Sequence, residues 1–139
     1  LKSKGYYKNN FMDGKWKFYY ENGNLMAEGE YILGDGGNKN INTDIPENGR
    51  NGKWTGWYPN GKKWSHLNYE KSKKHGIQEN WYENGQKELE GEYNYGKPIN
   101  TWQWWYIDGA PMQEGKYNLD GNFKGLYFIN PDVPTFINP

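Results

Sequence analysis

One short pattern occurs four times along this chain, and that repetition restricts the fold more than any other feature. Each copy centres on Asn or Asp followed by Gly, and a Tyr lies eight residues after every turn glycine. The second, third and fourth copies are spaced by 24 residues. The dipeptides are Asn22-Gly23, Asn60-Gly61, Asn84-Gly85 and Asp108-Gly109. A fixed period of this length is typical of arrays in which each copy forms one supersecondary unit.

We predict that each copy is a β-hairpin, because Asn-Gly or Asp-Gly between aromatic runs is a strong hairpin signal. The dipeptide indicates a two-residue type I′ turn, in which both central residues have positive φ. Counting outward from it gives the pairs Tyr20–Leu25, Tyr19–Met26, Phe18–Ala27, Lys17–Glu28, Trp16–Gly29 and Lys15–Glu30. Gly29 should therefore support the Trp16 indole, and Gly115 that of Trp102.

Successive hairpins are predicted to form one elongated antiparallel sheet, an all-β fold. Complete repeats are expected at 14–33, 52–75, 76–99 and 100–124, with half repeats at 1–13 and 125–130. The 14 extra residues within 34–51 form a Gly- and Asn-rich insertion, expected to be a disordered surface loop. Residues 131–139 form a proline-containing tail that should be extended and cannot be a central strand.

The composition fits a thin sheet covered by aromatic rings. Only 34% of residues are hydrophobic and the mean hydropathy is −1.23, yet 19% are aromatic, a content that disordered chains lack. Basic and acidic residues both number 17, so neither nucleic-acid binding nor adsorption to anionic lipid has an electrostatic driving force. No apolar stretch approaches 18 residues, so no membrane insertion is expected. The absence of cysteine excludes disulfides and thiolate chemistry.

The segments GKWKFYYENGNLMAEGEYILG (14–34) and GIQENWYENGQKELEGEYNYGK (76–97) resemble the bacterial variant of the MORN repeat. The resemblance extends from Lys4 to about Phe128, apart from the insertion, with departures at Leu67, Ser72 and Asn100. It implies a protein-interaction or scaffolding module, and no catalytic residue set belongs to the repeat. Some bacterial members carry an antitoxin label, and eukaryotic members have been linked to membrane lipid.

The residues suggest no catalytic or metal site and no cofactor. Neither His66 nor His75 has a nearby Ser, Cys or His partner in the sequence, which favours surface or packing roles. The alternating carboxylates Glu28, Glu30, Glu88, Glu90 and Glu92 fit a solvated charged face better than paired acid–base catalysis. Asn38, Asn40, Asn42 and Asp44 have an alternating, calcium-loop-like spacing. However, Thr43 and Gly49 stand where such a loop would need Gly and Glu.

A row of aromatic residues is the candidate binding surface. Strand alternation places Tyr19, Trp57, Trp64, Trp81 and Trp105 on one face of the sheet, together with Met26 and Met112. Tyr20, Tyr58, Tyr82 and Tyr106 line the other face. Because a single sheet cannot bury both faces against itself, we expect one row to be packed and the other to be an exposed binding stripe.

Two classes of function are consistent with these features. The first is a non-enzymatic protein-interaction or assembly module, in which chains could also associate head to tail through the unpaired strands of the half repeats. An antitoxin-like or immunity partner protein is a variant of this hypothesis. The second is glycan or cell-wall binding through the Trp/Tyr stripe. Because residue 1 is Leu rather than Met, we expect a processed protein or part of a longer one. The sequence does not identify the compartment, and a cell-surface or secreted location is slightly favoured over the cytoplasm.

Overall fold

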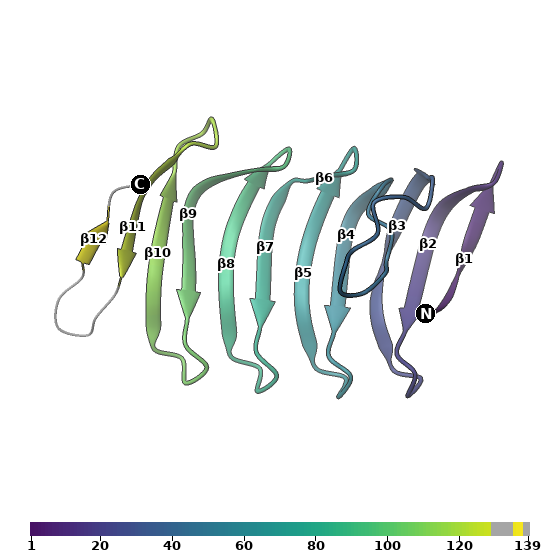
Figure 1. Ribbon diagram of the computed structural model, residues 1–139, viewed down its shortest axis with the longest axis horizontal. Helices are drawn as coiled ribbons and strands as arrows, with labels where there is room; N and C mark the ends of the chain where they lie inside the picture. Colours follow the sequence, from purple (N-terminus) through teal and green to yellow (C-terminus); the bar gives the residue numbers. More distant parts are fainter. Residues whose placement is uncertain (129–134, 138–139) are drawn as a thin grey trace.

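A computed structural model describes residues 1–128 and 135–137, which form one open antiparallel sheet of twelve strands (Figure 1). The strands are β1 (Lys2–Lys8), β2 (Phe11–Tyr19), β3 (Leu25–Gly34), β4 (Arg50–Trp57), β5 (Lys63–Glu70), β6 (Lys73–Lys74), β7 (Gly76–Trp81), β8 (Lys87–Asn94), β9 (Lys97–Trp105), β10 (Pro111–Tyr117), β11 (Phe123–Phe128) and β12 (Thr135–Ile137). They follow chain order across the sheet, except that β6 pairs with β5 beside β7. No helix occurs within these ranges. The predicted all-β fold, a single sheet of tandem hairpins, is confirmed.

The turn inside each repeat is not the predicted type I′ turn. In the first repeat, the Gly23 N–H donates to the Tyr20 carbonyl, and within the Asn-Gly dipeptide only Gly23 has a positive φ, of 88°. The Asn22 side chain accepts the N–H of Asn24 at 2.9 Å. The same backbone hydrogen bond recurs at Gly61, Gly85 and Gly109. This is a type I turn followed by a left-handed glycine, which makes the loop three residues long.

The longer turn shifts the strand pairing beside it by one residue. Tyr19 therefore pairs with Leu25 and not with Met26, which occupies the resulting bulge. Beyond the bulge the predicted register is confirmed for Phe18–Ala27, Lys17–Glu28, Trp16–Gly29 and Lys15–Glu30. The close ion pair joins diagonal partners, with the Lys15 Nζ 3.2 Å from a Glu28 carboxylate oxygen.

Two-residue turns with positive φ at both positions lie at the other ends of the strands, between repeats. They are Asn9-Asn10, Lys71-Ser72 and Tyr95-Gly96. A second left-handed position falls near the start of each first strand, at Gly14, Gly52, Gly76 and Asn100. Asn tolerates this conformation better than most residues, which explains how Asn100 replaces the expected glycine.

Indoles on the first strands join neighbouring hairpins. The pairs are Trp16 on Gly5, Trp54 on Gly29 and Trp102 on Gly91, where an added Cβ would lie 2.0–2.1 Å from the ring. The predicted stacking of Trp16 on Gly29 and of Trp102 on Gly115 is therefore wrong, although both register pairs are present. Lying across the junction, each indole buries apolar surface that neither hairpin could bury alone.

Tyrosine hydroxyls make a second set of ties between repeats. They donate to main-chain carbonyls of the next repeat in the pairs Tyr20–Trp57, Tyr58–Trp81 and Tyr82–Trp105, at 2.6–2.7 Å. Burial raises the pKa of all three hydroxyls.

The C-terminal part of the sheet ends on β12, which pairs with β11 through Leu126–Ile137, Tyr127–Phe136 and Phe128–Thr135. The last strand of the array is therefore partly covered by the tail, and β11 does not offer the free edge assumed for head-to-tail association. Residues 129–130 of the expected half repeat, and 131–134 and 138–139 of the expected tail, lie outside the described residues.

Candidate functional site

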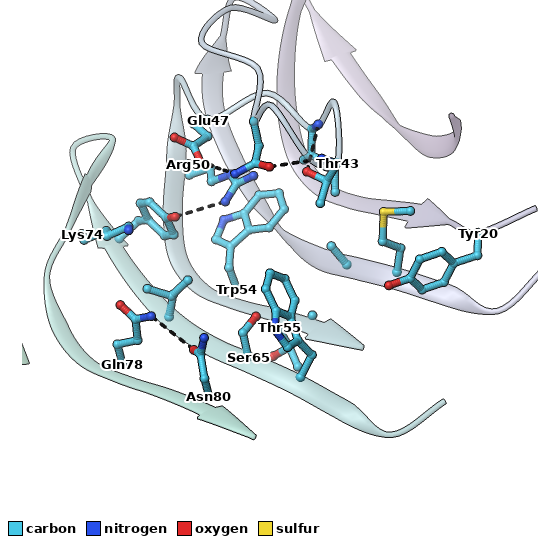
Figure 2. A pocket seen from close by; sticks show the side chains of 18 residues that line it. Tyr20, Thr43, Glu47, Arg50, Trp54, Thr55, Ser65, Lys74, Gln78 and Asn80 are labelled. Carbon is cyan, nitrogen blue, oxygen red and sulfur yellow. Dashed lines mark hydrogen bonds between the residues drawn. The ribbon is translucent and has the colours of Figure 1, made fainter. Parts of the chain in front are cut away.

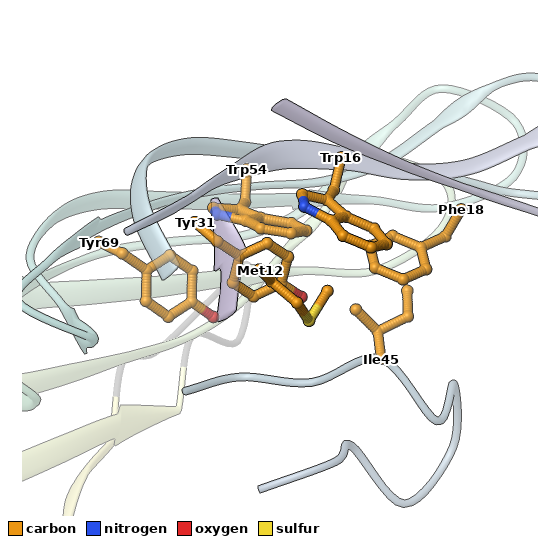
Figure 3. Packing of buried hydrophobic residues seen from close by; sticks show 7 residues of the cluster. All are labelled: Met12, Trp16, Phe18, Tyr31, Ile45, Trp54 and Tyr69. Carbon is orange, nitrogen blue, oxygen red and sulfur yellow. The ribbon is translucent and has the colours of Figure 1, made fainter. Parts of the chain in front are cut away.

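The insertion between β3 and β4 folds back over one face of the sheet, which we call the core face (Figure 3). This face carries the buried cluster of Met12, Trp16, Phe18, Tyr31, Ile45, Trp54 and Tyr69. Ile45 comes from the insertion and is only 2% exposed. The Tyr31 hydroxyl donates to the carbonyl of Pro46, also in the insertion, at 2.5 Å. The expectation of a disordered loop is therefore wrong, because one apolar side chain anchors the insertion in the core.

Polar side chains complete the shape of the insertion. The Asn40 carboxamide oxygen accepts the N–H groups of Asn42 and Thr43, while Asn38 and Asn40 donate to the two carboxylate oxygens of Glu47. The alternating Asn residues thus serve loop structure. Among the described residues, no group of three or more His, Cys, Asp or Glu side chains could hold a metal ion.

Ser72 fixes the end of the insertion from the neighbouring repeat. Its φ of 67° is left-handed, where glycine would be less strained. Its hydroxyl accepts the Gly49 N–H at 2.9 Å, and its own N–H donates to the Arg50 carbonyl at 3.2 Å. The departure from the repeat pattern at Ser72 therefore provides a side chain that holds the loop.

A break in the indole–glycine pairs lies beside the insertion. At the junction of β5 and β7, Leu67 stands where other repeats have glycine, and Gln78 stands where they have tryptophan. The Ser65–Asn80 and His66–Glu79 pairs set a register that next brings Leu67 and Gln78 together. Leu67 packs against the buried cluster, and no indole–glycine pair covers this junction, although ring contacts resume at Tyr93, Trp102 and Trp104.

The insertion and this break enclose a groove of about 200 Å³ on the core face, which we call the insertion groove (Figure 2). Its lining includes Arg50, Trp54, Trp64, Ser65, Lys74 and Asn80. Trp64 is 38% exposed at its edge, whereas Trp54 and Ser65 are 3% and 5% exposed. Within the described part of the chain, the Ser65 hydroxyl makes no hydrogen bond and Gln78 Oε1 is buried without a partner. The groove therefore combines aromatic walls with unused polar groups.

A buried arginine lies at one end of the insertion groove. The Arg50 guanidinium carbon is 4.3 Å from the centroid of the Trp54 ring and 5.4 Å from that of Tyr69. Burial raises the pKa of Tyr69, and the Arg50 charge opposes that rise. The same balance raises the pKa of Tyr31 to about 12, with burial dominant. Both phenols are therefore neutral hydrogen-bonding groups at physiological pH.

The structure divides the predicted aromatic stripe between the two faces. Trp57 lines a shallow hollow with Lys15, Glu28 and Lys63 on the face opposite the core. The Lys63 ammonium lies 5.6 Å from the centroid of the Trp81 ring on that face. Strand alternation places Tyr19 and Trp105 there as well. Trp64 and Met26 instead line the insertion groove, because each occupies a bulge beside its turn.

Each of the two histidines lies close to one glutamate, and some of the glutamates form ion pairs with lysine. His66 lies 3.9 Å from Glu79, and Lys87 lies 2.8 Å from Glu79 and 3.6 Å from Glu90. Burial, followed by the charge of Lys53, lowers the pKa of His66. His75 lies 3.6 Å from Glu70 and its Nδ1 accepts the Tyr95 N–H at 3.2 Å. Of the candidate carboxylates, Glu28 and Glu90 form lysine ion pairs and Glu92 accepts a hydrogen bond from the Asn100 side chain.

A family model described as "MORN repeat variant" matches residues 12–32, 50–71 and 74–95. No curated protein matches the chain. Several solved structures have a weak likeness to it, including the following three. Accessory secretory proteins 1, 2 and 3 of Streptococcus pneumoniae show a TM-score of 0.43 and 15% identity, over 63% of this chain and 17% of that one. A GtfA/B complex bound to UDP and GlcNAc shows a TM-score of 0.34 and 10% identity, and the match covers 62% of this chain and 22% of that one. TarM shows a TM-score of 0.35 and 10% identity, and the match covers 91% of this chain and 21% of that one. The chain thus spans about a fifth of the length of these structures.

The three matches fall on the first three predicted complete repeats, and the β9–β10 hairpin of the fourth has the same turn. No helix of membrane-spanning length and hydrophobicity is found in residues 1–128 and 135–137.

Proposed function

Because the chain belongs to the MORN-repeat family, we propose that it is a non-enzymatic interaction module whose protein partner docks in the insertion groove. Repeats of this family are generally protein-interaction modules, which supports the general class of function. One observation supports this location for the docking site. The insertion lies beside the junction where Leu67 and Gln78 replace the glycine and the tryptophan of the other repeats.

The size and lining of the groove favour part of a larger partner. Its 200 Å³ is below the roughly 300–1,000 Å³ of pockets that enclose a drug-sized ligand. A space of this size suits one or two side chains of a protein segment. The exposed edge of Trp64 provides the kind of aromatic contact that concentrates binding energy in interfaces.

Site-specific photo-crosslinking tests this location. A photoreactive phenylalanine analogue at position 64 should capture a partner from the lysate of the source organism, and excess unmodified protein should compete with it. The same analogue at position 57 is the matched control on the opposite face. Specific capture from position 57 alone would overturn the groove as the docking site. Where the captured protein is a toxin that this chain neutralises in a growth assay, the antitoxin or immunity variant of the proposal holds.

A second candidate function is glycan binding by the opposite face. Its aromatic residues Tyr19, Trp57, Trp81 and Trp105 recur every second strand, a spacing of about 10 Å. Regular ring spacing suits a repeating polymer, although the Lys63 ammonium already occupies a site over Trp81. Tryptophan fluorescence with soluble cell-wall glycans tests this hypothesis, with Trp57→Ala expected to abolish the response and Trp64→Ala to leave it unchanged.

Head-to-tail assembly is a third, more specific form of the interaction hypothesis. The tail strand β12 on β11 argues against it, since an incoming chain would have to displace three residue pairs. Light scattering over a concentration series tests it, and concentration-dependent growth of the particle mass would favour assembly over the groove.

A further inference from the structure

We infer that the insertion groove recognises an acidic peptide segment, with one carboxylate of the partner bound by Arg50 and Lys74. This inference rests on the proposed function and identifies the chemistry of the partner. The determining feature is a pair of cations that line the groove, neither of which forms an ion pair with the described chain.

Arg50 is 8% exposed, yet its guanidinium is only partly used. Its Nε donates to the Pro46 carbonyl at 3.0 Å, and its Nη1 donates to the Tyr69 hydroxyl at 3.1 Å. A guanidinium has five N–H donors. The Tyr31 hydroxyl also lies within hydrogen-bonding reach of the guanidinium. Arg50 lines the groove, and its remaining N–H groups make no further hydrogen bond to the described residues. The fork is therefore fixed by Trp54 and Tyr69 and has one free edge.

No carboxylate of the described chain forms an ion pair with this guanidinium. Arg50 forms no ion pair within 4.0 Å there, and neither does Lys74 on β6 of the same repeat. The Lys74 ammonium lies 5.3 Å from the centroid of the Tyr93 ring. The Glu47 carboxylate also lines the groove and keeps its charge, which acts on Tyr31 and Tyr69 as that of Arg50 does, but it forms no ion pair with the guanidinium within 4.0 Å. Buried charges in proteins are normally paired, because desolvation without a counter-ion is costly. A carboxylate from a partner would supply the missing charge and could bind the free edge of the arginine in a bidentate manner.

The rest of the groove indicates which kind of residue should neighbour the acidic one in the partner. Away from Arg50, the Ser65 hydroxyl and the Asn80 side-chain N–H groups lack acceptors in the described residues, and Trp64 forms an exposed apolar edge. Ser65 and Asn80 are directly paired across β5 and β7. They can donate to main-chain carbonyls of an extended segment. The partner should therefore present a Glu or Asp close to a large apolar residue.

The test uses two peptide probes that differ in one group, N-acetyl-Glu-Trp-amide and N-acetyl-Gln-Trp-amide. Each is titrated into the full chain while the Arg50 Nε–H and the Trp54 and Trp64 indole N–H signals are followed by NMR. The Glu probe should shift all three signals and bind at least about tenfold more tightly than the Gln probe, a ratio reasonable for one charge-assisted bidentate contact. Its affinity should fall as salt is added.

Lys74→Gln should weaken binding of the Glu probe about threefold to tenfold, the range expected for a neighbouring charge that is partly screened. Lys73→Gln is the matched control, since it makes the same charge change at an exposed position outside the groove. Arg50→Lys keeps the charge but removes the fork, and should weaken binding at least as much. Its folding is checked by the dispersion of the tryptophan signals.

Equal affinity for the two probes, or equal effects of Lys74→Gln and Lys73→Gln, would overturn the acidic-peptide inference. Binding of anionic lipid vesicles through the same signals, without a response to the Glu probe, would also overturn it. The docking site itself would survive these results if crosslinking from position 64 still captured a protein. Failure of that crosslink, with an intact probe response, would count against the proposed function instead.

Discussion

The hydroxyl of Tyr58 donates a 2.6 Å hydrogen bond to the main-chain carbonyl of Trp81, 23 residues further along the chain. The acceptor belongs to the next repeat, so this hydrogen bond connects two neighbouring repeats. Together with the equivalent bonds from Tyr20 and Tyr82, it joins the hairpins at their turn ends. Stability in such an array is close to a sum of repeat and neighbour contributions. Each junction can therefore be tested separately.

Tyr58→Phe should lower the free energy of unfolding by about 0.5–1.5 kcal/mol, the usual value of one hydrogen bond. The ring remains, so the packing against Trp64 is retained. Tyr106→Phe is the control, because the Tyr106 hydroxyl has no hydrogen bond among the described residues and the residue is 49% exposed. Urea unfolding measures both variants, and equal losses would contradict a role for the tie.

The indole–glycine pair should behave as one unit that Leu and Gln can replace. Gly91→Leu alone should clash with the Trp102 ring, since even a Cβ would lie 2.0 Å away. Trp102→Gln alone should leave a cavity. Combining them reproduces the natural Leu67 and Gln78 arrangement, and the double variant should recover about 1–3 kcal/mol relative to the sum of the single losses. A thermodynamic cycle from chemical unfolding provides the measurement, and strict additivity would argue against the pairing.

Gly85→Val should destabilise the third hairpin by about 1–2 kcal/mol, because a β-branched residue is strained at positive φ. Gly85 has a φ of 89° and no atom within 4 Å of an added Cβ, so the loss reports backbone conformation and not a clash. Gly85→Asn is the control, since Asn tolerates this conformation better. Thermal melting distinguishes them, and identical melting temperatures would contradict the turn assignment.

Ser72→Gly should loosen the insertion without weakening the sheet. Glycine relieves the left-handed backbone at this position, but the acceptor for the Gly49 N–H is lost. The melting temperature should therefore change little while hydrogen exchange at the Gly49 amide accelerates by about tenfold, as expected for one hydrogen bond. Amide exchange at Ile32, whose N–H donates to the Gly49 carbonyl, shows whether the base of the loop opens as well. Unchanged exchange at Gly49 would show that Ser72 does not hold the loop.

Stability should fall in mild acid because of His66. Its folded-state pKa lies below the ordinary value of 6.5, mainly through burial, so the unfolded chain binds a proton at a higher pH than the native protein does. This contribution is complete above pH 6.5 and is lost as the pH falls from 6.5 through the folded-state pKa. His66→Gln should flatten the pH dependence of the unfolding free energy in this interval. An unaltered profile in the variant would assign the loss to other groups.

The hairpin array could be predicted from the sequence because its signals are local and repeated. Asn-Gly dipeptides, alternating residues and constant spacing indicate the strands and most of the register. The turn type was wrong because a type I turn with a left-handed glycine uses the same dipeptide as a type I′ turn. The indole stacking was wrong because it depends on the packing of neighbouring hairpins, which intra-hairpin counting does not describe.

The insertion groove was missed, although its determinants are visible in the sequence as departures from the repeat. Leu67 and Ser72 were recognised as departures, but their significance depends on the groups beside them in space. Gln78 carries the complementary signal, since it replaces a tryptophan at the position next to Leu67. Ile45 gave no signal, because a single apolar residue in a polar segment has no periodicity.

The insertion leaves β3 at Gly34 and re-enters the sheet at Arg50, and the Ile32–Gly49 hydrogen bond closes its base. The two strands that it connects are neighbours in the array, so the pairing of these strands does not restrict the number of residues in the insertion. New residues could be added there, or the whole segment exchanged, without altering a strand pair. The paired strands of the array must therefore stay constant, whereas the insertion can vary in sequence and length. Related proteins could acquire different binding specificities by replacing this one segment.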